Sequence, residues 1–113
     1  MAQITNQRLA PPQQLPVGTP GVLYTVPGGG TSAVVVAVIT VVNTTPTPID
    51  VTLYLCVGGG PANDSNTLVP GPTIEGNQLV NFNFGHDIHP GDTIQGFSTA
   101  LGITVHLSGI VFA

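Results

Sequence analysis

Charged residues are scarce in this sequence. Only six of its 113 residues are charged, whereas a globular domain averages about 25%. Arg8 is the one cation, and the formal net charge is −4. Proteins that bind nucleic acids or anionic membranes rely on clusters of Lys and Arg, so we expect neither partner. Because a surface with few charges resists association poorly, we expect the chain to work while packed against copies of itself or another protein.

Other common signals are also missing. Cys56 is the only cysteine, so an intrachain disulfide is impossible and no redox compartment can be inferred. The first residues lack a basic segment followed by an apolar one, so we expect no secretory signal peptide and synthesis in a cytoplasm. The longest apolar run, residues 33–39, is far shorter than the roughly 20 residues of a membrane-spanning helix.

Residues 1–20 differ in composition from the rest of the chain. They combine prolines with Gln, Asn and Thr, which favours extended or polyproline-II geometry. We interpret this segment as an extended N-terminal arm and residues 21–113 as one β-sandwich domain. Two possibilities stay open for the arm: a disordered tail, or an arm that docks through spaced apolar residues. Those residues are Ile4, Leu9, Leu15 and Val17.

The rest of the sequence consists of short strand patterns. Runs rich in Val, Ile and Thr are separated by Gly, Pro and Asn, and several alternate between apolar and polar residues. In the run 49–57 we expect Val51, Leu53, Leu55 and Val57 to face inward and Thr52, Tyr54 and Cys56 to face outward. In the last run Ile103, Val105, Leu107 and Val111 form the apolar side. No segment shows a helical period. Seven or eight short antiparallel strands predict a β-sandwich of jelly-roll or related Greek-key type. The expected strands are 22–26, 33–42, 49–57, 67–69, 78–84, 93–97 and 103–112.

The strand expected at residues 33–42 is apolar on both faces. Strict alternation places Val34, Val36, Val38 and Val42 on one face, and Val35, Ile39 and Val41 on the other. A strand of this kind must be covered on both sides. The second face is then covered either by another subunit or by a loop or the arm. The predicted partner contacts are therefore Ile4, Leu9, Leu15, Val17, Val35, Ile39 and Val41.

The densest group of ionisable residues is the segment His86-Asp87-Ile88-His89. Imidazole and carboxylate groups bind several divalent metals, and a symmetry axis could bring copies of these residues together. No further Cys or His pair completes a tetrahedral set. We therefore favour a plain loop between strands and predict no metal site.

No set of residues in the sequence indicates catalysis. There is no nucleophile elbow, and the glycine runs at 28–30 and 58–60 lack the Lys and the following helix of a phosphate loop. Asp92 lies in a Pro-Gly-Asp turn, where a carboxylate usually bonds to nearby backbone. Tyr24 and Tyr54 could border a carbohydrate platform, but the chain has no Trp. We expect no enzyme activity and no cofactor.

The order of these strand and turn motifs resembles that of small β-sandwich structural proteins of tailed bacteriophages. The resemblance covers residues 23–112 and includes capsid decoration, head-fibre and tail accessory proteins. It rests on strand and turn patterns, so it implies a fold and a virion context but carries over no functional residue. The motifs are L-Y-T-V-P at 23–27, A-V-V-V at 33–36, N-T-T at 43–45, V-T-L-Y-L at 51–55, P-G-D-T-I at 90–94 and L-S-G-I at 107–110.

The resemblance, together with the scarcity of charge, predicts a capsid decoration, or cement, protein. Such a protein would stabilise the capsid lattice through self-association, as a homotrimer, and through arm contacts with the major capsid protein or other virion proteins. It would be made in the host cytoplasm and lie on the capsid surface of the virion. The alternative is a head- or tail-fibre or baseplate module that contacts host-surface glycans.

Overall fold

The computed structural model describes residues 4–28 and 33–112, with the side chains of all these except residues 4–7, 10, 35–37, 64, 84 and 86. The described chain consists almost entirely of β-strands, with two single 3-10 turns between the fourth and fifth strands. The strands are β1 (Ile4–Gln14), β2 (Gly21–Thr25), β3 (Ala33–Asn43), β4 (Ile49–Cys56), β5 (Thr67–Ile74), β6 (Leu79–Ile88), β7 (Thr93–Ser98) and β8 (Ile103–Phe112). The turns are η1 (Val57–Gly59) and η2 (Asp64–Asn66).

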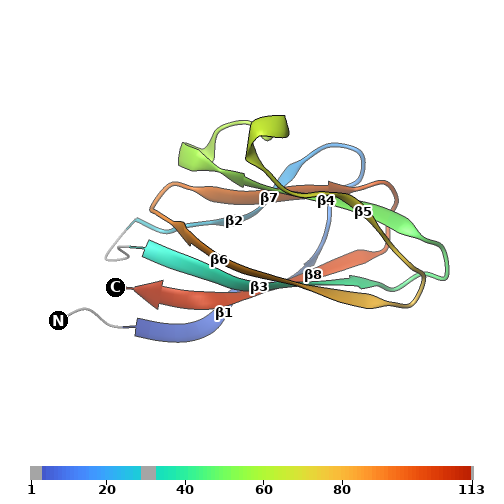
Figure 1. The fold of residues 1–113 in the computed structure, drawn as a ribbon, viewed down its shortest axis with the longest axis horizontal. Helices are drawn as coiled ribbons and strands as arrows, with labels where there is room; N and C mark the ends of the chain where they lie inside the picture. The colour runs from blue at the N-terminus through green and yellow to red at the C-terminus, as the bar shows by residue number, and fades with distance from the viewer. Residues whose placement is uncertain (1–3, 29–32, 113) are drawn as a thin grey trace.

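The strands form two stacked sheets of four strands each (Figure 1). The first, called here the β3 sheet, has the order β1-β8-β3-β6, and the second, the β4 sheet, has the order β2-β7-β4-β5. All the pairs of named strands are antiparallel. Consecutive strands repeatedly cross from one sheet to the other, which is the connectivity of a jelly roll. The fold class expected from the sequence is therefore confirmed.

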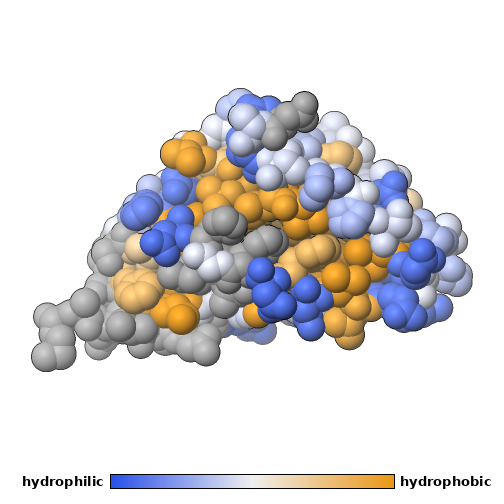
Figure 2. All heavy atoms as spheres, viewed as in Figure 1, coloured by the Kyte–Doolittle hydropathy of each residue, from blue (hydrophilic) through white to orange (hydrophobic). Residues whose placement is uncertain are grey.

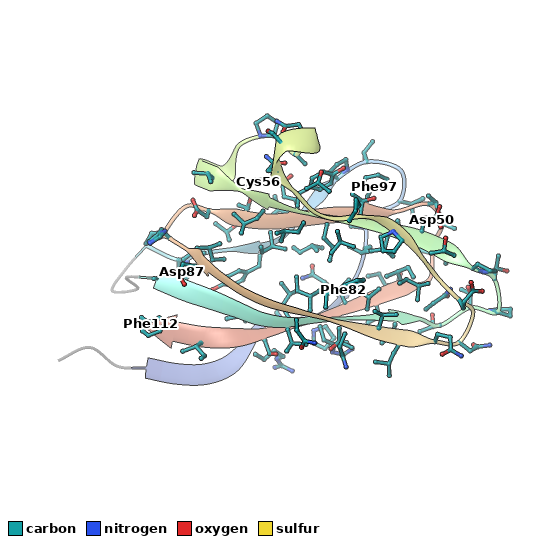
Figure 3. The ribbon with its side chains drawn as sticks, viewed as in Figure 1. Asp50, Cys56, Phe82, Asp87, Phe97 and Phe112 are labelled. Atoms are coloured by element: carbon teal, nitrogen blue, oxygen red, sulfur yellow. The ribbon has the colours of Figure 1, made fainter. Side chains whose placement is uncertain are left out.

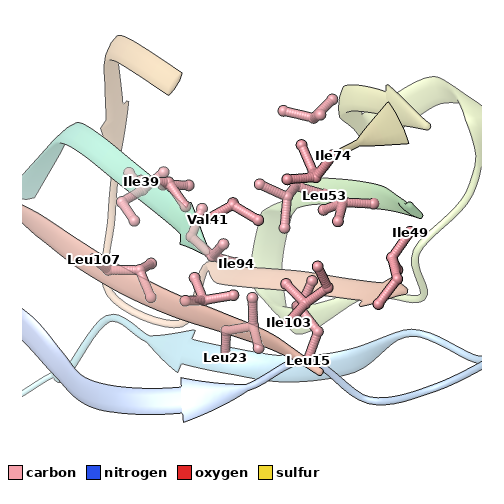
Figure 4. Close-up of a cluster of buried hydrophobic side chains, with 14 of the residues drawn as sticks. Leu15, Leu23, Ile39, Val41, Ile49, Leu53, Ile74, Ile94, Ile103 and Leu107 are labelled. Atoms are coloured by element: carbon pink, nitrogen blue, oxygen red, sulfur yellow. The ribbon is translucent and has the colours of Figure 1, made fainter. Parts of the chain in front are cut away.

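The core lies between the two sheets, where alternate side chains of each strand point inward (Figure 4). On β4 the expected alternation holds, because Val51 and Leu53 are fully buried and Thr52 and Tyr54 point outward. Val57, also expected inside, comes after the end of the strand and is 77% exposed. The members of the core with no measurable exposure are Val34, Ile39, Val41, Val51, Leu53, Ile88, Ile94, Ile103, Val105 and Leu107.

A β-bulge in β3 changes which of its residues face the core. The pairing with β6 and with β8 shifts between Val36 and Val38, and one extra residue in a strand reverses the side on which all later residues point. Ile39 and Val41 therefore lie in the core with Val34. The prediction that Ile39 and Val41 face a partner is corrected, because strict alternation does not hold across the bulge.

The segment expected to be an arm is part of the sandwich. Residues 4–14 form β1, which pairs along β8 from Ile4 opposite Phe112 to Gln14 opposite Thr104. Leu15, expected to contact a partner, is only 2% exposed and belongs to the core. Proline is tolerated here because β1 is an edge strand, whose free side needs no donors.

Asn43 connects the two sheets at the end of β3. Its buried side-chain amide donates to the carbonyl oxygens of Thr47 (2.7 Å) and of Ile74 in β5 (3.0 Å). Its side-chain oxygen accepts from the backbone N–H (3.0 Å) and the hydroxyl (2.8 Å) of Thr45. All four hydrogen-bonding positions of this amide are thus occupied, which fixes the 44–48 loop and joins β3 to β5.

Candidate interaction surfaces

The outer face of the β3 sheet is uncharged along its middle. Val38, Thr40 and Val42 of β3 point outward and are half-buried between the outward side chains of β8 and β6. The Thr40 hydroxyl donates to the side-chain oxygen of Asn81 at 2.7 Å. Figure 1 shows no described segment lying over this sheet. The second face of this strand was expected to be covered either by another subunit or by a loop or arm of the same chain. Among the described residues no loop or arm covers it (Figure 1).

The remaining predicted contacts are spread over different surfaces. Leu9 of β1 is half-buried and packs against the core. Val17, just after β1, is 48% exposed and bridges in parallel to Ser98. The side chains of Ile4 and Val35 lie outside the described residues. The structure therefore does not bring the predicted contacts together into one patch.

The outer face of the β4 sheet carries an aromatic pair. The rings of Tyr54 on β4 and Phe97 on β7 stack with centroids 6.3 Å apart and planes 18° apart. Figure 3 shows Phe97 on the outer side of this sheet, away from the core. Both rings are only half-buried. This is an apolar, uncharged spot suited to contact with another molecule.

The loop between β4 and β5, residues 57–66, folds back over part of the same face. Gln95 donates from its side-chain amide to the carbonyl oxygen of Gly60 at 3.1 Å. Beneath this loop Cys56, expected to point outward, is fully buried. Burial raises the pKa of the Cys56 thiol, and a hydrogen bond with Thr93 partly offsets the rise. The thiol is therefore held protonated and shielded, which is the environment of an unreactive cysteine.

Asp92 holds this loop against the turn between β6 and β7. One carboxylate oxygen accepts from the backbone N–H of Gly58 at 2.8 Å, and the other accepts from the N–H of His89 at 3.0 Å. The side chain is 8% exposed. The bond to His89 agrees with the expected role of Asp92 as a turn residue, and Asp92 occupies no cavity in which it could act on a ligand.

The four free edges of the two sheets are protected unequally. β1 carries two exposed prolines, β5 contains Pro70 and Pro72, and β2 is only five residues long. Proline and short length are the usual protections against the addition of a further strand. β6 is 10 residues long and has no proline and no cation, with Asp87 as its one charged residue. Sequence reasoning missed this edge, because the central strands β3, β4, β7 and β8 lack proline as well and no local signal marks β6 as an edge.

The side of the sandwich between β5 and β6 also exposes apolar atoms. Figure 2 shows orange, hydrophobic atoms in a band between the two sheets on the side facing the viewer. Figure 1 shows β6 passing in front of β3 on that side. The half-buried apolar residues of β4, β5 and β6 that pack on the core are Leu55, Leu68, Val80 and Phe82. The band therefore adjoins the unprotected β6 edge.

Few features of the described residues suggest small-molecule chemistry. No pocket opens among them, and no three His, Cys, Asp or Glu gather there as a metal-binding group. No helix of the described chain is long and apolar enough to cross a membrane. His89 is exposed in its turn, and the side chain of His86 is not described. Tyr24 packs against the core, and this burial raises the pKa of its hydroxyl. Tyr24 therefore does not border an open carbohydrate platform with Tyr54.

Comparison with known proteins finds a similarity in fold. No protein-family model matches the sequence, and no curated protein matches it. The fold is similar to a chain of a solved structure described as "Structure of infectious bursal disease virus Gx strain", with a TM-score of 0.62 and 10% sequence identity. The match covers 99% of this chain and 33% of the viral chain, so this chain spans about a third of its length. At this identity the likeness shows the fold alone; membership of a tailed-phage family stays a prediction.

Proposed function

We propose that this protein is a non-enzymatic structural protein of a virion and works by packing against copies of itself and other virion proteins. The observation that carries the proposal is that 99% of this chain matches part of a viral chain in fold. Jelly rolls are common in viral capsids and also occur in lectin domains and cupins. The described surface is compatible with packing, because it has few charges and no pocket.

The specific role that we propose is capsid decoration, in which the protein binds the major capsid protein on the capsid surface as a homotrimer. Buried apolar area contributes about 25 cal/mol per Å², so many identical contacts would reinforce a lattice without covalent bonds. The structure changes one part of the sequence-based hypothesis. Residues 4–15 are occupied within their own sandwich, so lattice contacts would come from sheet faces and edges instead of a free arm.

Copy number in purified virus particles tests the proposal. Quantitative mass spectrometry against an isotope-labelled standard should find this protein in a fixed ratio to the major capsid protein, amounting to many copies in each particle. A handful of copies would indicate a fibre or tail tip and would contradict decoration. Complete absence from particles would contradict any structural role in the virion.

One observation favours a second candidate, a module that binds host-surface glycans. The stacked Tyr54–Phe97 pair lies half-exposed on the outer face of the β4 sheet, and aromatic rings pack well against the apolar faces of sugars. A glycan array probed with the wild-type protein and with Phe97→Ala separates the two functions. Binding that Phe97→Ala removes would support the glycan module, whereas an array without signal would leave decoration.

A further inference from the structure

β6 presents a row of backbone groups that its own sheet does not use. The N–H of Asn43 donates to the carbonyl oxygen of Gln78 at 2.9 Å, just before β6 begins. Hydrogen-bonded and non-bonded pairs alternate along an antiparallel ladder. The backbone groups of Leu79, Asn81 and Asn83 therefore point away from β3. Within the described chain β6 pairs only with β3, so this edge is open to a further strand.

The two free edges of the β3 sheet carry opposite charges. Arg8 on β1 is paired with Ser108 of β8. Asp87 on β6 is paired with Val35 of β3, which is paired in turn with Ile110 of β8. Ser108 and Ile110 alternate with the core side of β8, so Arg8 and Asp87 are both on the outer face of the sheet. Both are exposed, and neither makes an ion pair among the described residues. Three strand spacings of about 4.8 Å separate the edges, which exceeds the Debye length of about 8 Å in physiological salt. Arg8 and Asp87 therefore cannot neutralise each other within one molecule.

We propose that β6 of one copy pairs with β1 of the next copy, with Asp87 beside Arg8. This inference rests on the proposed function, because it assumes that the protein assembles with itself. β1 and β6 run in opposite directions in their sheet, so a second copy set alongside in the same orientation continues an antiparallel ladder. The part of β1 available for pairing is residues 4–10, ahead of its two prolines. With Asp87 opposite Asn6, which is also its row across its own sheet, unbroken pairing sets residues 83–88 of β6 opposite residues 10–5 of β1. Asp87 is then the diagonal neighbour of Arg8 on the same face, within reach of a long side chain.

The proposed contact joins two different surfaces, so it is head-to-tail. A head-to-tail contact forms a closed ring if the rotation between copies closes, and an open chain if it does not. A homotrimer would be one such ring. The other way to use the β6 edge is a twofold β6–β6 contact. That arrangement leaves Asp87 without an opposite charge and gives Arg8 no role, so the charges favour the β6–β1 contact.

Charge reversal in the full-length chain tests the pairing. The association constant would be measured by sedimentation velocity over a concentration series for Arg8→Glu, Asp87→Lys and the double variant. Each reversal replaces an attraction by a repulsion, so we expect each single variant to associate about tenfold more weakly. The double variant should recover to within about threefold of wild type. Circular dichroism and thermal unfolding check the fold, which exposed side chains without intrachain ion pairs should not affect.

Salt gives a second readout of the same contact. Raising the sodium chloride concentration from about 50 to 500 mM should weaken association of the wild type and of the double variant, because added ions screen the charge pair. If the double variant associates no better than the single ones, the pairing is wrong. If Arg8→Glu associates as wild type does, a β6–β6 contact replaces the proposed one.

A proline on the free edge tests the strand pairing itself. Asn83→Pro removes an N–H that points away from β3, and Asn83→Thr is the matched control that keeps the N–H and a side chain suited to strands. We expect Asn83→Pro to remain folded and to lose association at least tenfold, while Asn83→Thr associates as wild type does. Undiminished association of a folded Asn83→Pro would overturn the use of this edge, and the charge reversals decide the matter if Asn83→Pro does not fold.

The outcomes separate this inference from the proposed function. A protein that is present in particles at lattice copy number but shows no response to charge reversal would remain a virion component with a different contact. A protein that pairs through Arg8 and Asp87 but is absent from particles would keep the edge contact and lose the virion role.

Discussion

Replacing Asn43 with aspartate is expected to destabilise the fold strongly at neutral pH. Aspartate has the same shape and keeps the two bonds that the Asn43 oxygen accepts from Thr45. In place of the two donated bonds it sets a carboxylate oxygen against the carbonyl oxygens of Thr47 and Ile74. Asn43 has no measurable exposure, so water cannot relieve this contact.

The size of the effect follows from these contacts. Two lost hydrogen bonds cost about 1 kcal/mol each, and burying a charge that faces two acceptors adds roughly 2 kcal/mol or more. A total of about 4 kcal/mol is a large share of the 5–15 kcal/mol, roughly, by which domains are stable. The new carboxyl would have a folded-state pKa above its unfolded value of about 3.9. The folded state then binds the proton more tightly, so the loss is smallest in acid and grows as pH rises through the folded-state pKa.

Urea unfolding followed by far-UV circular dichroism measures this loss at about pH 3.5 and pH 7. The matched control is Asn81→Asp, which makes the same chemical change on an exposed side chain that acts as an acceptor for Thr40. We expect the control to lie within about 0.5 kcal/mol of wild type at both pH values. Equal stability of the two variants at pH 7 would refute the role assigned to Asn43.

Three further experiments, two substitutions and one chemical labelling, test other parts of the structure. Leu15→Ala should cost about 2–5 kcal/mol, because Leu15 is in the core, whereas Leu101→Ala at an exposed position should cost under about 0.5 kcal/mol; thermal unfolding compares the two. Gly76→Ala should lower the melting temperature, because its methyl group would overlap the backbone of the loop after β3, whereas Gly85→Ala meets open space. The Cys56 thiol should react with a thiol reagent only when the chain unfolds, so labelling in native buffer that is as rapid as in urea would contradict its burial.

The positions of most strands along the sequence were readable because strands and breaks have clear local signals. Alternation over residues 49–57 and 103–111 placed Val51, Leu53 and Leu107 in the core correctly, but it also placed Val57 inside, where the structure has it 77% exposed. The first strand was missed because proline and glutamine usually argue against a strand. Only the pairing with β8, a contact distant in sequence, shows that β1 is an edge at which Pro11 and Pro12 cost nothing.

Errors at the candidate contact surfaces have one physical cause. Side-chain direction in a strand depends on register, and no local pattern in residues 33–42 reveals the bulge that turns Ile39 and Val41 inward. Cys56 illustrates the same limit, since alternation correctly put it outside the core but could not show the 57–66 loop that covers it. The composition did indicate scarce charge, but which edges carry Arg8 and Asp87 depends on the fold.

The pairing of Ile4 with Phe112 brings the two ends of the described chain together at one end of the sandwich (Figure 1). A linker of a few residues between them would turn β8 and β1 into a hairpin, so a circularly permuted form should keep the same core. For the same reason the domain could be inserted into a surface loop of another protein, which it would enter and leave at nearly the same point. A peptide fused to either end would project from that end of the molecule, close to Asp87, which lies across the sheet from Ile110 and Asn6. A bulky fusion there should therefore weaken the proposed β6–β1 pairing.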